Sequence, residues 1–566
     1  GCGGDRDKDK RSIMGKIANK YSDSIFITDD NPRNENPNNI RNQIKKNISK
    51  YKLFEIPSRS EAISTAIKKL KSGDVLIVAG KGHENYQEYK KSRFFSDRKE
   101  ILKSINKKNK YLSKSVKTNI LNEVLGNNII KKNNIINFAS INSKKIYKNS
   151  VFFGIKGKRF DGNKFAGEAI KNGAIIAITN KKNKSPKEIF FKKPLGLFNN
   201  INSRLIKTIN FERIAITGSA GKTSVKELTG FCLSKLKKTY FSKGSLNNKF
   251  GVPLSIFNTP LSTKFTVLEV GMDKKGEIDY LTKLIKPNLG LITNVSYAHI
   301  KNFNNLNQIA RAKGEIIDNI TYDGTMIINM DDKYYKYFFK KCRDRQINIL
   351  TYSKKNHNAD IVFLNKRKQK KNYIIDIKIK GKIKSFSIPK FLSNYIENIL
   401  ATISIISNYF DTKELNNNLF SGFVVPKSRG SLINFKNNSK KLTIVDESYN
   451  SNPLSFKFAL ERYDSFYKKN NKKFLLIGNM LELGKFSKKL HIKIAKYINK
   501  SKINKTYAYG DLTRHTFNKL KPQKRGKILK NEIEIYKLIN NELPNNSFLM
   551  VKGSNSTGLN KIFQNL

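Results

Sequence analysis

The sequence predicts an α/β fold class, with several domains in a chain of 566 residues. Short apolar runs alternate with stretches whose apolar residues recur at helical spacing, which is typical of parallel sheets covered by helices. A strand, a glycine-rich loop and a helix follow one another at residues 214–229. The same alternation returns between residues 471 and 560. Since single cores rarely grow beyond about 250 residues, we expect three to five domains.

Residues 1–105 contain the first such alternation. We expect buried strands at 24–28 and 74–79 and amphipathic helices at 13–21 and 61–70. Polar residues follow the strands, and ligands bind at the carboxyl ends of strands in an open α/β sheet. This region is therefore a candidate binding module.

Three polar clusters in this module are the candidate site: Gly1 to Asp7, Asp30-Asn-Pro-Arg33 and Gly80-Lys-Gly-His-Glu84. Arginine can hold a carboxylate through two parallel hydrogen bonds, and Asp30 and Glu84 can hold an ammonium group. Asp-Asn-Pro is also an ordinary turn signal. The clusters therefore fit either a site for a zwitterion or simple turn chemistry.

Residues 106–118 are rich in Lys and Asn, and we expect a charged linker there. A small α/β region follows, with strands expected near Phe138, from Ser150 and at 174–179, joined by polar turns.

The segment Ile214-Ala-Ile-Thr-Gly-Ser-Ala-Gly-Lys-Thr-Ser224 is typical of a phosphate-binding strand, loop and helix. Backbone N–H groups of the loop and the helix N-terminus can bind phosphate oxygens, Lys222 can reach the terminal phosphates and Thr223 can hold Mg²⁺. The loop is the shorter Gly-x-x-Gly-Lys-Thr, because Ile216 stands where a standard P-loop has glycine. The alternative is a glycine pair before an ordinary helix. The predicted nucleotide site comprises Gly218, Ser219, Ala220, Gly221, Lys222, Thr223 and Ser224.

Two later strands end in polar residues that can serve this loop. Glu269 lies on an otherwise apolar strand at 265–271, and a buried carboxylate needs a cationic partner, so we assign it to Mg²⁺ rather than to a structural ion pair. The strand at 291–299 ends with Asn294 and His299. An isolated histidine is usually structural, but its place after a strand beside the other candidates favours a ligand role.

The last region, from about residue 426, again alternates strands and helices. Its strand from Thr443 ends in Asp446-Glu-Ser-Tyr-Asn-Ser-Asn-Pro453, which is also a good turn sequence. A faint internal repeat relates residues 1–105 to residues 471–560.

Composition restricts the partners that can be expected. Lys and Arg number 110 against 44 acidic residues, a net charge of +66, which suggests nucleic acid. The lysines are spread over the full length, however, and no aromatic stacking platform or arginine-rich face accompanies them. We expect a solvated basic surface and no specific nucleic-acid partner.

Three isolated cysteines indicate a reducing compartment without disulfides, and the apolar runs are too short to span a membrane. The chain begins without Met or an apolar leader, as a cut piece would.

The N-terminal clusters carry a resemblance. Gly-Cys-Gly-Gly-Asp-Arg-Asp, Asp-Asn-Pro-Arg and Gly-Lys-Gly-His-Glu, in this order, are similar to the C-terminal domain of Mur ligases that add meso-diaminopimelate. The resemblance implies a diaminopimelate-type site at Arg6, Asp30, Asn31, Arg33, Gly80 and Glu84. Without its own phosphate loop, this module is not expected to catalyse that step. The strand and helix that should precede Gly1 are missing, so we expect an exposed sheet edge or local disorder.

The small α/β region resembles the UDP-binding first domain of Mur ligases. In that family Ser143 and residues 156–163 would face the nucleotide sugar. Lys144 stands where arginine is usual, and lysine lacks the planar fork that binds two oxygens at once.

The central region resembles Mur ligases that add D-alanyl-D-alanine. The matching motifs are Thr217 to Ser224, Ser245 to Pro253, Glu269-Val-Gly with Gly276-Glu-Ile, Asn294 with Ala298-His299, and Ala312-Lys-Gly-Glu315. The resemblance implies that Glu269 and His299 bind Mg²⁺, that Asn247 and Asn248 line the substrate cleft, and that Asn329 approaches adenine. Lys313 matches the lysine that the family carbamylates, which turns an ammonium into an anion for a second Mg²⁺.

The last region resembles the family's Asp-x-x-Tyr-Asn-Ala-Asn-Pro motif and the motifs around it. This implies that Asp446, Asn450 and Asn452 close over ATP and that Arg429 reaches its phosphates. Three residues depart from the family pattern: Asn394 replaces a histidine, Asn479 an aspartate and Asn555 an arginine.

The resemblance implies a three-domain Mur ligase with an extra partial Rossmann-like domain at its N-terminus. The expected boundaries are 1–105 for the partial module, 106–118 for the linker, 119–204 for a small UDP-sugar-binding α/β domain, 205–425 for the P-loop α/β domain and 426–566 for a Rossmann-like C-terminal domain.

The implied reaction joins D-alanyl-D-alanine to UDP-N-acetylmuramoyl-tripeptide, with ATP and two Mg²⁺ ions, in the cytoplasm. It would make a peptidoglycan precursor and so serve cell shape and division. We expect a monomer, and a natural fusion of two ligases. Three alternatives remain: a folylpolyglutamate-synthase-like ligase, which shares the short loop; a basic nucleic-acid-binding ATPase; and an N-terminal module that serves only docking or regulation.

Overall fold

The computed structural model of the chain describes residues 1–566 apart from short gaps. These gaps are 71–73, 82–83, 113–115, 127–128, 131–134, 158–159, 182–184, 243, 370–371, 438–439, 467–471 and 563–566. Gly82 and His83 of the N-terminal cluster, and residues 158–159 of the expected UDP segment, therefore lie outside the described residues. No helix in the described part of the chain combines the length and apolar character needed to cross a bilayer.

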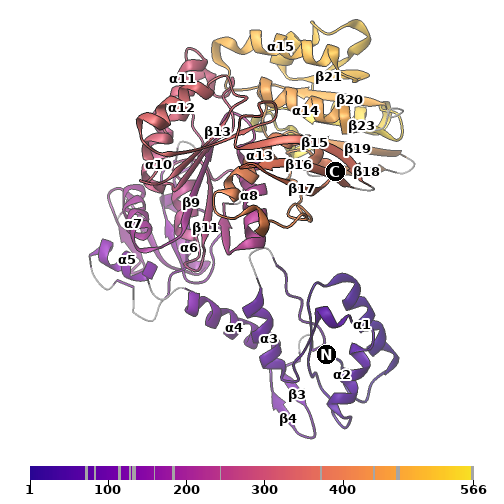
Figure 1. The fold of residues 1–566 in the computed structure, drawn as a ribbon. Helices are drawn as coiled ribbons and strands as arrows, with labels where there is room; N and C mark the ends of the chain where they lie inside the picture. The colour runs from indigo at the N-terminus through magenta and orange to yellow at the C-terminus, as the bar shows by residue number, and fades with distance from the viewer. Residues whose placement is uncertain are drawn as a thin grey trace.

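The N-terminal module is a small α/β unit that Figure 1 shows apart from the rest of the molecule. Its β1 and β2 pair in parallel, with Ile25 opposite Leu53. Buried Ile25, Ile27, Ile40 and Ile44 form its core. In chain order its elements are α1 (Asp9–Tyr21), β1 (Ile25–Ile27), α2 (Pro37–Lys45), β2 (Leu53–Glu55), α3 (Arg59–Lys69), β3 (Tyr86–Glu88), β4 (Ser92–Phe94) and α4 (Asp97–Leu112).

The expected buried strand at 74–79 is wrong. These residues belong to no strand, and the side chains of Val75 and Ile77 are 82% and 83% exposed. In the described part of this module the parallel sheet contains only β1 and β2, and residues 74–79 do not add a third strand to it.

The expected linker at 106–118 is also wrong in part. Helix α4 continues to Leu112 and α5 (Val116–Leu125) begins four residues later. Lysine is a good helix former, and the apolar Ile101, Leu102 and Ile105 recur at helical spacing, so a lysine-rich stretch extends the helix here.

The second unit is a four-stranded parallel sheet in the order β5-β6-β7-β8. Its strands are β5 (Phe138–Ser140), β6 (Ser150–Phe153), β7 (Ala174–Thr179) and β8 (Glu188–Phe190), and its helices are α5, α6 (Ala166–Lys171) and α7 (Pro194–Thr208). The expected boundary between 204 and 205 falls inside α7, which packs against both α5 and α9 (Gly251–Asn258). The buried Leu197, Phe198 and Ile201 of α7 make this helix part of the core that joins the two units.

The central unit contains a nine-stranded sheet in the order β10-β11-β9-β12-β13-β14-β15-β16-β17. Strands β10 to β15 pair in parallel and β15 to β17 form an antiparallel meander. The strands are β9 (Glu212–Thr217), β10 (Thr239–Phe241), β11 (Phe265–Glu269), β12 (Leu289–Ile292), β13 (Thr325–Asn329), β14 (Asn348–Ser353), β15 (Ile361–Gln369), β16 (Asn372–Ile379) and β17 (Lys382–Pro389). The covering helices are α8 (Lys222–Leu236), α9, α10 (Glu277–Ile285), α11 (Leu306–Gly314), α12 (Tyr335–Asp344) and α13 (Ile396–Ser407).

The C-terminal unit has a six-stranded sheet in the order β18-β19-β23-β20-β21-β22, in which the β18–β19 pair is antiparallel and the other pairs are parallel. Its strands are β18 (Ser431–Asn437), β19 (Lys440–Asp446), β20 (Lys473–Gly478), β21 (Lys505–Tyr509), β22 (Arg525–Leu529) and β23 (Ser547–Lys552). Its helices are α14 (Pro453–Phe466), α15 (Ser487–Lys500), α16 (Arg514–Phe517), α17 (Glu532–Lys537) and α18 (Leu559–Ile562). One continuous core runs from the central sheet into this unit, from Leu268 and Met326 to Leu475 and Met550.

Candidate active site

The phosphate loop connects β9 to α8 as the sequence predicts. Gly218 and Gly221 have φ values of +146° and +85°, which a residue with a side chain rarely adopts. The neighbouring strand β12 ends at Ile292, earlier than predicted, and Asn294 in the loop after it accepts a hydrogen bond from Ala220 N at 2.9 Å. Lys222 is the first residue of α8, and its Nζ donates to Gly218 O at 2.7 Å. Asn294 thus fixes the backbone of the loop, and the Lys222 side chain bends back to contact it.

Glu269 meets Thr223 at the end of β11. The Thr223 hydroxyl donates to Glu269 Oε2 at 2.6 Å, and Asn247 Nδ2 donates to Oε1 at 2.7 Å. The carboxylate is 1% exposed. Hydroxyl and carboxylate oxygens are the ligands that Mg²⁺ prefers, so this pair fits the ion that the sequence predicts. The strand and the helix place both oxygens at the same edge of the sheet.

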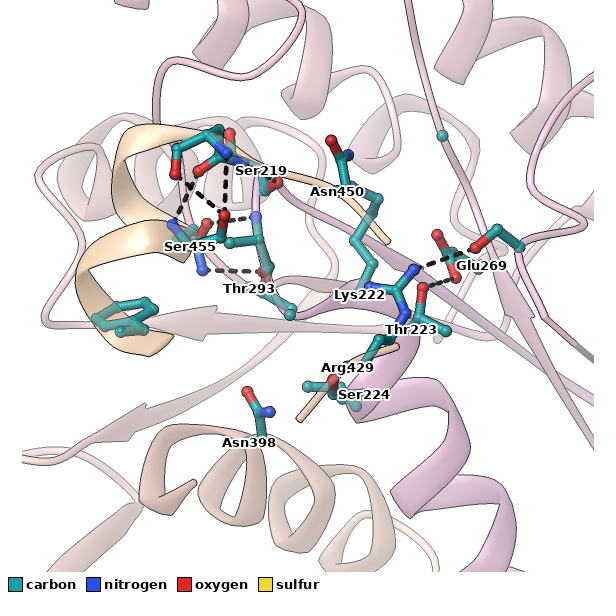
Figure 2. Close-up of a pocket in the computed structure, with 18 of the residues that line it drawn as sticks. Ser219, Lys222, Thr223, Ser224, Glu269, Thr293, Asn398, Arg429, Asn450 and Ser455 are labelled. Carbon is teal, nitrogen blue, oxygen red and sulfur yellow. Dashed lines mark hydrogen bonds between the residues drawn. The ribbon is translucent and has the colours of Figure 1, made fainter. Parts of the chain in front are cut away.

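These residues line a cleft of about 1180 Å³ between the central and C-terminal units. Figure 2 shows Lys222, Thr223 and Glu269 on one side and Asn450 and Ser455 approaching from the other unit. Predicted residues that line it are Ser219, Ala220, Gly221, Lys222, Thr223, Ser224, Asn247, Asn248, Glu269, Asn294, His299, Asn394, Arg429, Asn450 and Asn452. Most of the predicted nucleotide and substrate residues therefore share one cavity.

The C-terminal unit reaches the phosphate loop directly. Asn452 Nδ2 donates to Ser219 O at 3.4 Å, and Arg429 Nη2 donates to Ser245 Oγ at 3.2 Å. The Arg429 guanidinium stacks on the Tyr449 ring, 4.2 Å from its centroid. Stacking leaves the donors at the edge of a guanidinium free to meet an anion.

Three predicted nucleotide residues, Gly218, Asp446 and Asn329, do not line the cleft. Asp446 is 3% exposed and accepts hydrogen bonds from the hydroxyls of Ser428 and Ser448, at 2.7 and 2.5 Å. Asn329 is 7% exposed and donates to Thr293 O at 3.3 Å. Asp446 and Asn329 each stand at the end of a buried strand. In this conformation their side chains form hydrogen bonds with neighbouring protein groups and do not face the cleft.

Lys313 is buried on α11, with 2% of its surface exposed. Burial lowers its pKa well below its ordinary value, and the positive charge of Lys222 lowers it further, while Asp332 opposes the shift. A neutral amine is the form that reacts with CO₂. The environment of Lys313 therefore suits the carbamylation that the resemblance implies.

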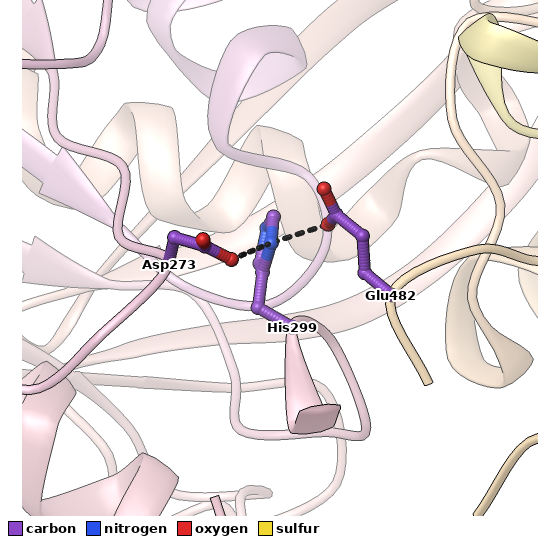
Figure 3. Close-up of side chains that lie close together, drawn as sticks. All are labelled: Asp273, His299 and Glu482. Carbon is purple, nitrogen blue, oxygen red and sulfur yellow. Dashed lines mark ion pairs between the residues drawn. The ribbon is translucent and has the colours of Figure 1, made fainter. Parts of the chain in front are cut away.

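His299 lies at the junction of the two units rather than against Glu269. Its Nδ1 is 2.5 Å from Oε2 of Glu482, which belongs to the C-terminal unit, and 3.7 Å from Asp273 Oδ1 (Figure 3). Burial lowers its pKa, but the hydrogen bonds to the two carboxylates outweigh this and raise the pKa above its ordinary value. The three side chains could hold a cation together. In this conformation the predicted magnesium ligand forms an ion pair between the units.

The predicted UDP residue Ser143 lies far from this cleft in the chain and does not line it. Its hydroxyl donates to Glu168 Oε2 at 2.9 Å, and the residue is 6% exposed. Asn163 is equally buried and joins Asp161 to the backbone of Asn180. These contacts fix the turns of the small sheet.

The N-terminal module brings most of its predicted site together around Lys81. Lys81 Nζ donates to Asn31 Oδ1 at 2.7 Å and lies 3.5 Å from Asp30 and 3.8 Å from Glu84. Asn31 Nδ2 also donates to Glu84 Oε2 at 2.8 Å. A side chain on Gly80, which has a φ of +123°, would meet Gly1 O and Asp30 at under 3.0 Å.

The two arginines predicted for that site, Arg6 and Arg33, differ from the prediction. Arg33 Nη1 donates to Gly4 O at 2.6 Å, and its Nε pairs with Glu88. Arg6 is exposed. Lys81 thus neutralises the acids that were expected to hold an ammonium group, because a buried carboxylate takes the nearest cation.

Comparison with known protein families matches all of these units. The Mur ligase middle domain matches residues 216–406, and the Mur ligase family catalytic domain matches residues 135–215. The Mur ligase glutamate ligase domain matches twice, at 1–82 and at 433–555. A UDP-N-acetylmuramoyl-tripeptide--D-alanyl-D-alanine ligase of Rickettsia prowazekii is 30% identical over 434 residues, which cover 75% of this chain and 94% of that protein.

The chain belongs to the Mur ligase family. A second relative matches only the N-terminal module of this Mur ligase. It is the UDP-N-acetylmuramoyl-L-alanyl-D-glutamate--2,6-diaminopimelate ligase of Rickettsia typhi, 59% identical over 87 residues, which cover 15% of this chain and 18% of that protein. The Mur ligase fold is also that of two solved structures. MurF from Acinetobacter baumannii has a TM-score of 0.66 at 21% identity, and the match covers 77% of this chain and 94% of that one. MurF from Thermotoga maritima in complex with ADP has a TM-score of 0.63 at 22% identity, and the match covers 75% of this chain and 96% of that one.

The sequence did not single out several residues that this Mur ligase places in the cleft. The Arg462 guanidinium stacks 4.4 Å from the Tyr395 ring of the central unit and pairs with buried Glu447 at 2.6 Å. Lys552 donates to Asn450 O at 2.9 Å, and burial lowers its pKa to about 8. Two of these residues lie within motifs that the sequence analysis recognised. Glu447 is in the Asp446 to Pro453 motif, and Lys552 is in Val-Lys-Gly-Ser.

Proposed function

We propose that this Mur ligase joins D-alanyl-D-alanine to UDP-N-acetylmuramoyl-tripeptide in its meso-diaminopimelate form, using ATP, as a step in peptidoglycan precursor synthesis. The observation that carries the proposal is the cleft in which Lys222, Thr223 and Glu269 of the central unit face Arg429 and Asn450 of the C-terminal unit. A relative whose name states this reaction matches the chain over 94% of its own length.

The residues in the cleft suit phosphoryl transfer to a carboxylate. The loop amides and Lys222 orient the γ-phosphate of ATP, and Arg429 lies where it can neutralise charge on the transferring group. A carboxylate oxygen of the tripeptide attacks the γ-phosphorus, the bond to the bridging oxygen breaks, and ADP leaves with the electron pair. The product is an acyl phosphate.

The second step forms the amide. The neutral amine of D-alanyl-D-alanine attacks the acyl carbon, a tetrahedral intermediate forms, and inorganic phosphate leaves as the amine gives up a proton. No nucleophilic side chain is needed, so rate enhancement rests on positioning and charge stabilisation. The cleft lies between two units, and closure of one on the other would exclude water from the acyl phosphate.

We propose two Mg²⁺ ions, of which the first would be held by donors that line the cleft. Thr223 and Glu269 would hold one, and Glu269, His299 and carbamylated Lys313 would hold the second once His299 leaves Glu482. When bound, Mg²⁺ neutralises the charge that develops on the phosphate oxygens.

The N-terminal module would carry a second, diaminopimelate-type site without a phosphate loop among residues 1–105. Support comes from the match of residues 1–82 to the same domain family as residues 433–555, which places two such domains in one chain. The match to the diaminopimelate-adding relative covers only 18% of that protein, and its activity is not assigned to this module.

The test is phosphate release from ATP by the purified chain with UDP-N-acetylmuramoyl-tripeptide, with and without D-alanyl-D-alanine. We expect release that needs both substrates and is lost in Lys222→Ala. Turnover that ignores the dipeptide but responds to RNA would favour the basic ATPase. Turnover with a folate and glutamate would favour a folylpolyglutamate-synthase-like ligase.

A further inference from the structure

We infer that Lys226 is a positioning residue of the active site, which holds the loop at residues 242–248 (the cleft loop) against the phosphate-loop helix α8. Its kinetic consequences rest on the proposed function. Lys226 does not line the cleft itself, so it acts through the loop that it holds.

The ammonium group of Lys226 is enclosed by oxygen atoms. The side chain is fully buried, and Nζ donates to Ser242 O and, at 2.7 Å, to Gly244 O. Glu227 Oε1 lies 2.7 Å away and balances the charge. A buried ammonium is stable only when oxygens satisfy it. The carbonyls of Ser242 and Gly244 therefore have to converge on this atom.

The local backbone is shaped to bring those carbonyls inward. Gly244 has a φ of +62°, a left-handed conformation that favours glycine. One turn further along α8, Gly230 leaves space for the Phe241 ring, since a Cβ there would approach it to 2.3 Å. Lys226 and Gly230, on successive turns of α8, thus contact Gly244 and Phe241 and fix the chain at the start of the cleft loop.

The far end of the cleft loop carries the groups that meet the site. Asn247 Nδ2 donates to Glu269 at 2.7 Å, and the backbone N–H of Gly271 donates to Asn247 O at 2.8 Å. Ser245 Oγ accepts from Arg429 of the C-terminal unit at 3.2 Å. The loop therefore links the metal-binding acid to the arginine that closes over the cleft.

Thr223 and Lys226 are three residues apart on α8 and so project from the same side of the helix. Thr223 contacts Glu269 directly, while Lys226 reaches the same carboxylate through the cleft loop and Asn247. These contacts form a closed ring of helix, loop and strand. Removing Lys226 opens the ring without touching Asn294, which holds the phosphate loop independently.

The kinetic test is Lys226→Met, which keeps a long apolar side chain but removes the charge. We expect kcat to fall ~10- to 100-fold, because misplaced groups at the reacting centre cost about that much. The KM for ATP should change less than about threefold, since the phosphate loop stays intact. A merely structural defect would lower the active fraction and leave both substrates' KM values unchanged, whereas we expect the KM for the UDP-linked peptide to rise.

A double-mutant cycle with Asn247→Ala tests the route of the effect. If Lys226 acts through the cleft loop, the combined loss is smaller than the product of the two single losses. The matched control is Lys235→Met on the same helix, where an exposed lysine donates to Ser421 O at 2.6 Å outside the cleft. It should keep wild-type kinetics. Wild-type kinetics in Lys226→Met, or fully independent losses, would overturn the inference.

A second readout does not depend on the reaction. Amide hydrogen exchange in a peptide covering 241–252 should become faster in Lys226→Met, while a peptide covering 289–296 keeps its wild-type rate. Unchanged exchange at 241–252 would refute the role of Lys226 even if the proposed reaction is wrong. If Lys226→Met does not fold, Lys226→Gln, which keeps one donor, is measured in the same two ways and must show the same pattern.

Discussion

Thr223 of the phosphate-loop helix donates a hydrogen bond to Glu269 of the neighbouring strand, at 2.6 Å in a buried position. A threonine and a glutamate 46 positions apart thus present two oxygen ligands side by side. The pairing follows from β9 and β11 being parallel neighbours, with Ile216 opposite Glu269. It joins the nucleotide loop to the metal-binding acid in the proposed reaction.

The first prediction concerns this pair. Glu269→Gln keeps the size of the side chain but removes its charge, and we expect kcat to fall ~10²- to 10³-fold with a higher Mg²⁺ requirement. The measurement is phosphate release across a Mg²⁺ titration. Thr266→Val, on the same strand, is the control, because the Thr266 hydroxyl has no partner among the described residues. An unchanged Mg²⁺ requirement in Glu269→Gln would remove Glu269 from the metal site.

The second prediction concerns Lys313. Its pKa is lowered by burial, so the neutral amine is populated at lower pH than for an exposed lysine, and we expect a carbamate to form in bicarbonate buffer. With ¹³C-labelled bicarbonate, nuclear magnetic resonance should show a carbamate signal that Lys313→Arg abolishes. A signal that persists in Lys313→Arg would assign the carbamate to another lysine, and no signal in the wild type would exclude the modification.

The third prediction concerns the contact between the central and C-terminal units at His299 and Glu482. The pair is partly exposed, so its loss in Glu482→Gln should destabilise the observed arrangement of the two units by up to ~1 kcal/mol. We expect a small increase in the radius of gyration by X-ray scattering. Glu461→Gln, which breaks a pair within one helix, should leave it unchanged. Identical scattering from Glu482→Gln and wild type would mean that other contacts set the observed arrangement of the two units.

The fourth prediction concerns Lys117, which is buried on α5 and donates to Asn137 O and Thr259 O. Burial lowers its pKa from 10.5 to about 7. Between these values the unfolded chain binds a proton that the native state does not, so the free energy of unfolding rises with pH by up to ~1.4 kcal/mol per unit. Below pH 7 Lys117 is charged in both states, and the desolvation of its buried charge lowers the free energy of unfolding by a constant amount.

Lys117→Met removes this dependence. Its Tm, followed by circular dichroism, should exceed the wild-type Tm by more at pH 7 than at pH 9. The control is Lys171→Met, an exposed lysine in the same unit, which should leave the difference near zero at both values. An advantage of Lys117→Met that does not shrink with pH would show that Lys117 is charged throughout this range.

The elements that sequence reasoning predicted well are those with strong local signals. The phosphate loop appears between β9 and α8, and Glu269 ends a fully buried strand, because glycine spacing and an acid in an apolar run are local properties. The run at 74–79 shows the limit of the same reasoning. Its residues are apolar enough for a buried strand, but burial needs a neighbouring strand, and local sequence does not reveal whether one is present.

The candidate site divides in the same way. Sequence alone predicted the nucleotide loop, its lysine and its acid, because each of them is recognisable from its neighbours along the chain. Tertiary structure alone decided that His299 meets Glu482, that Asp446 lies beneath the cleft, and that Lys226, one lysine among many, is buried against Gly244. Such contacts join residues distant in the chain, and their energies depend on burial and on partners that only the folded molecule brings together.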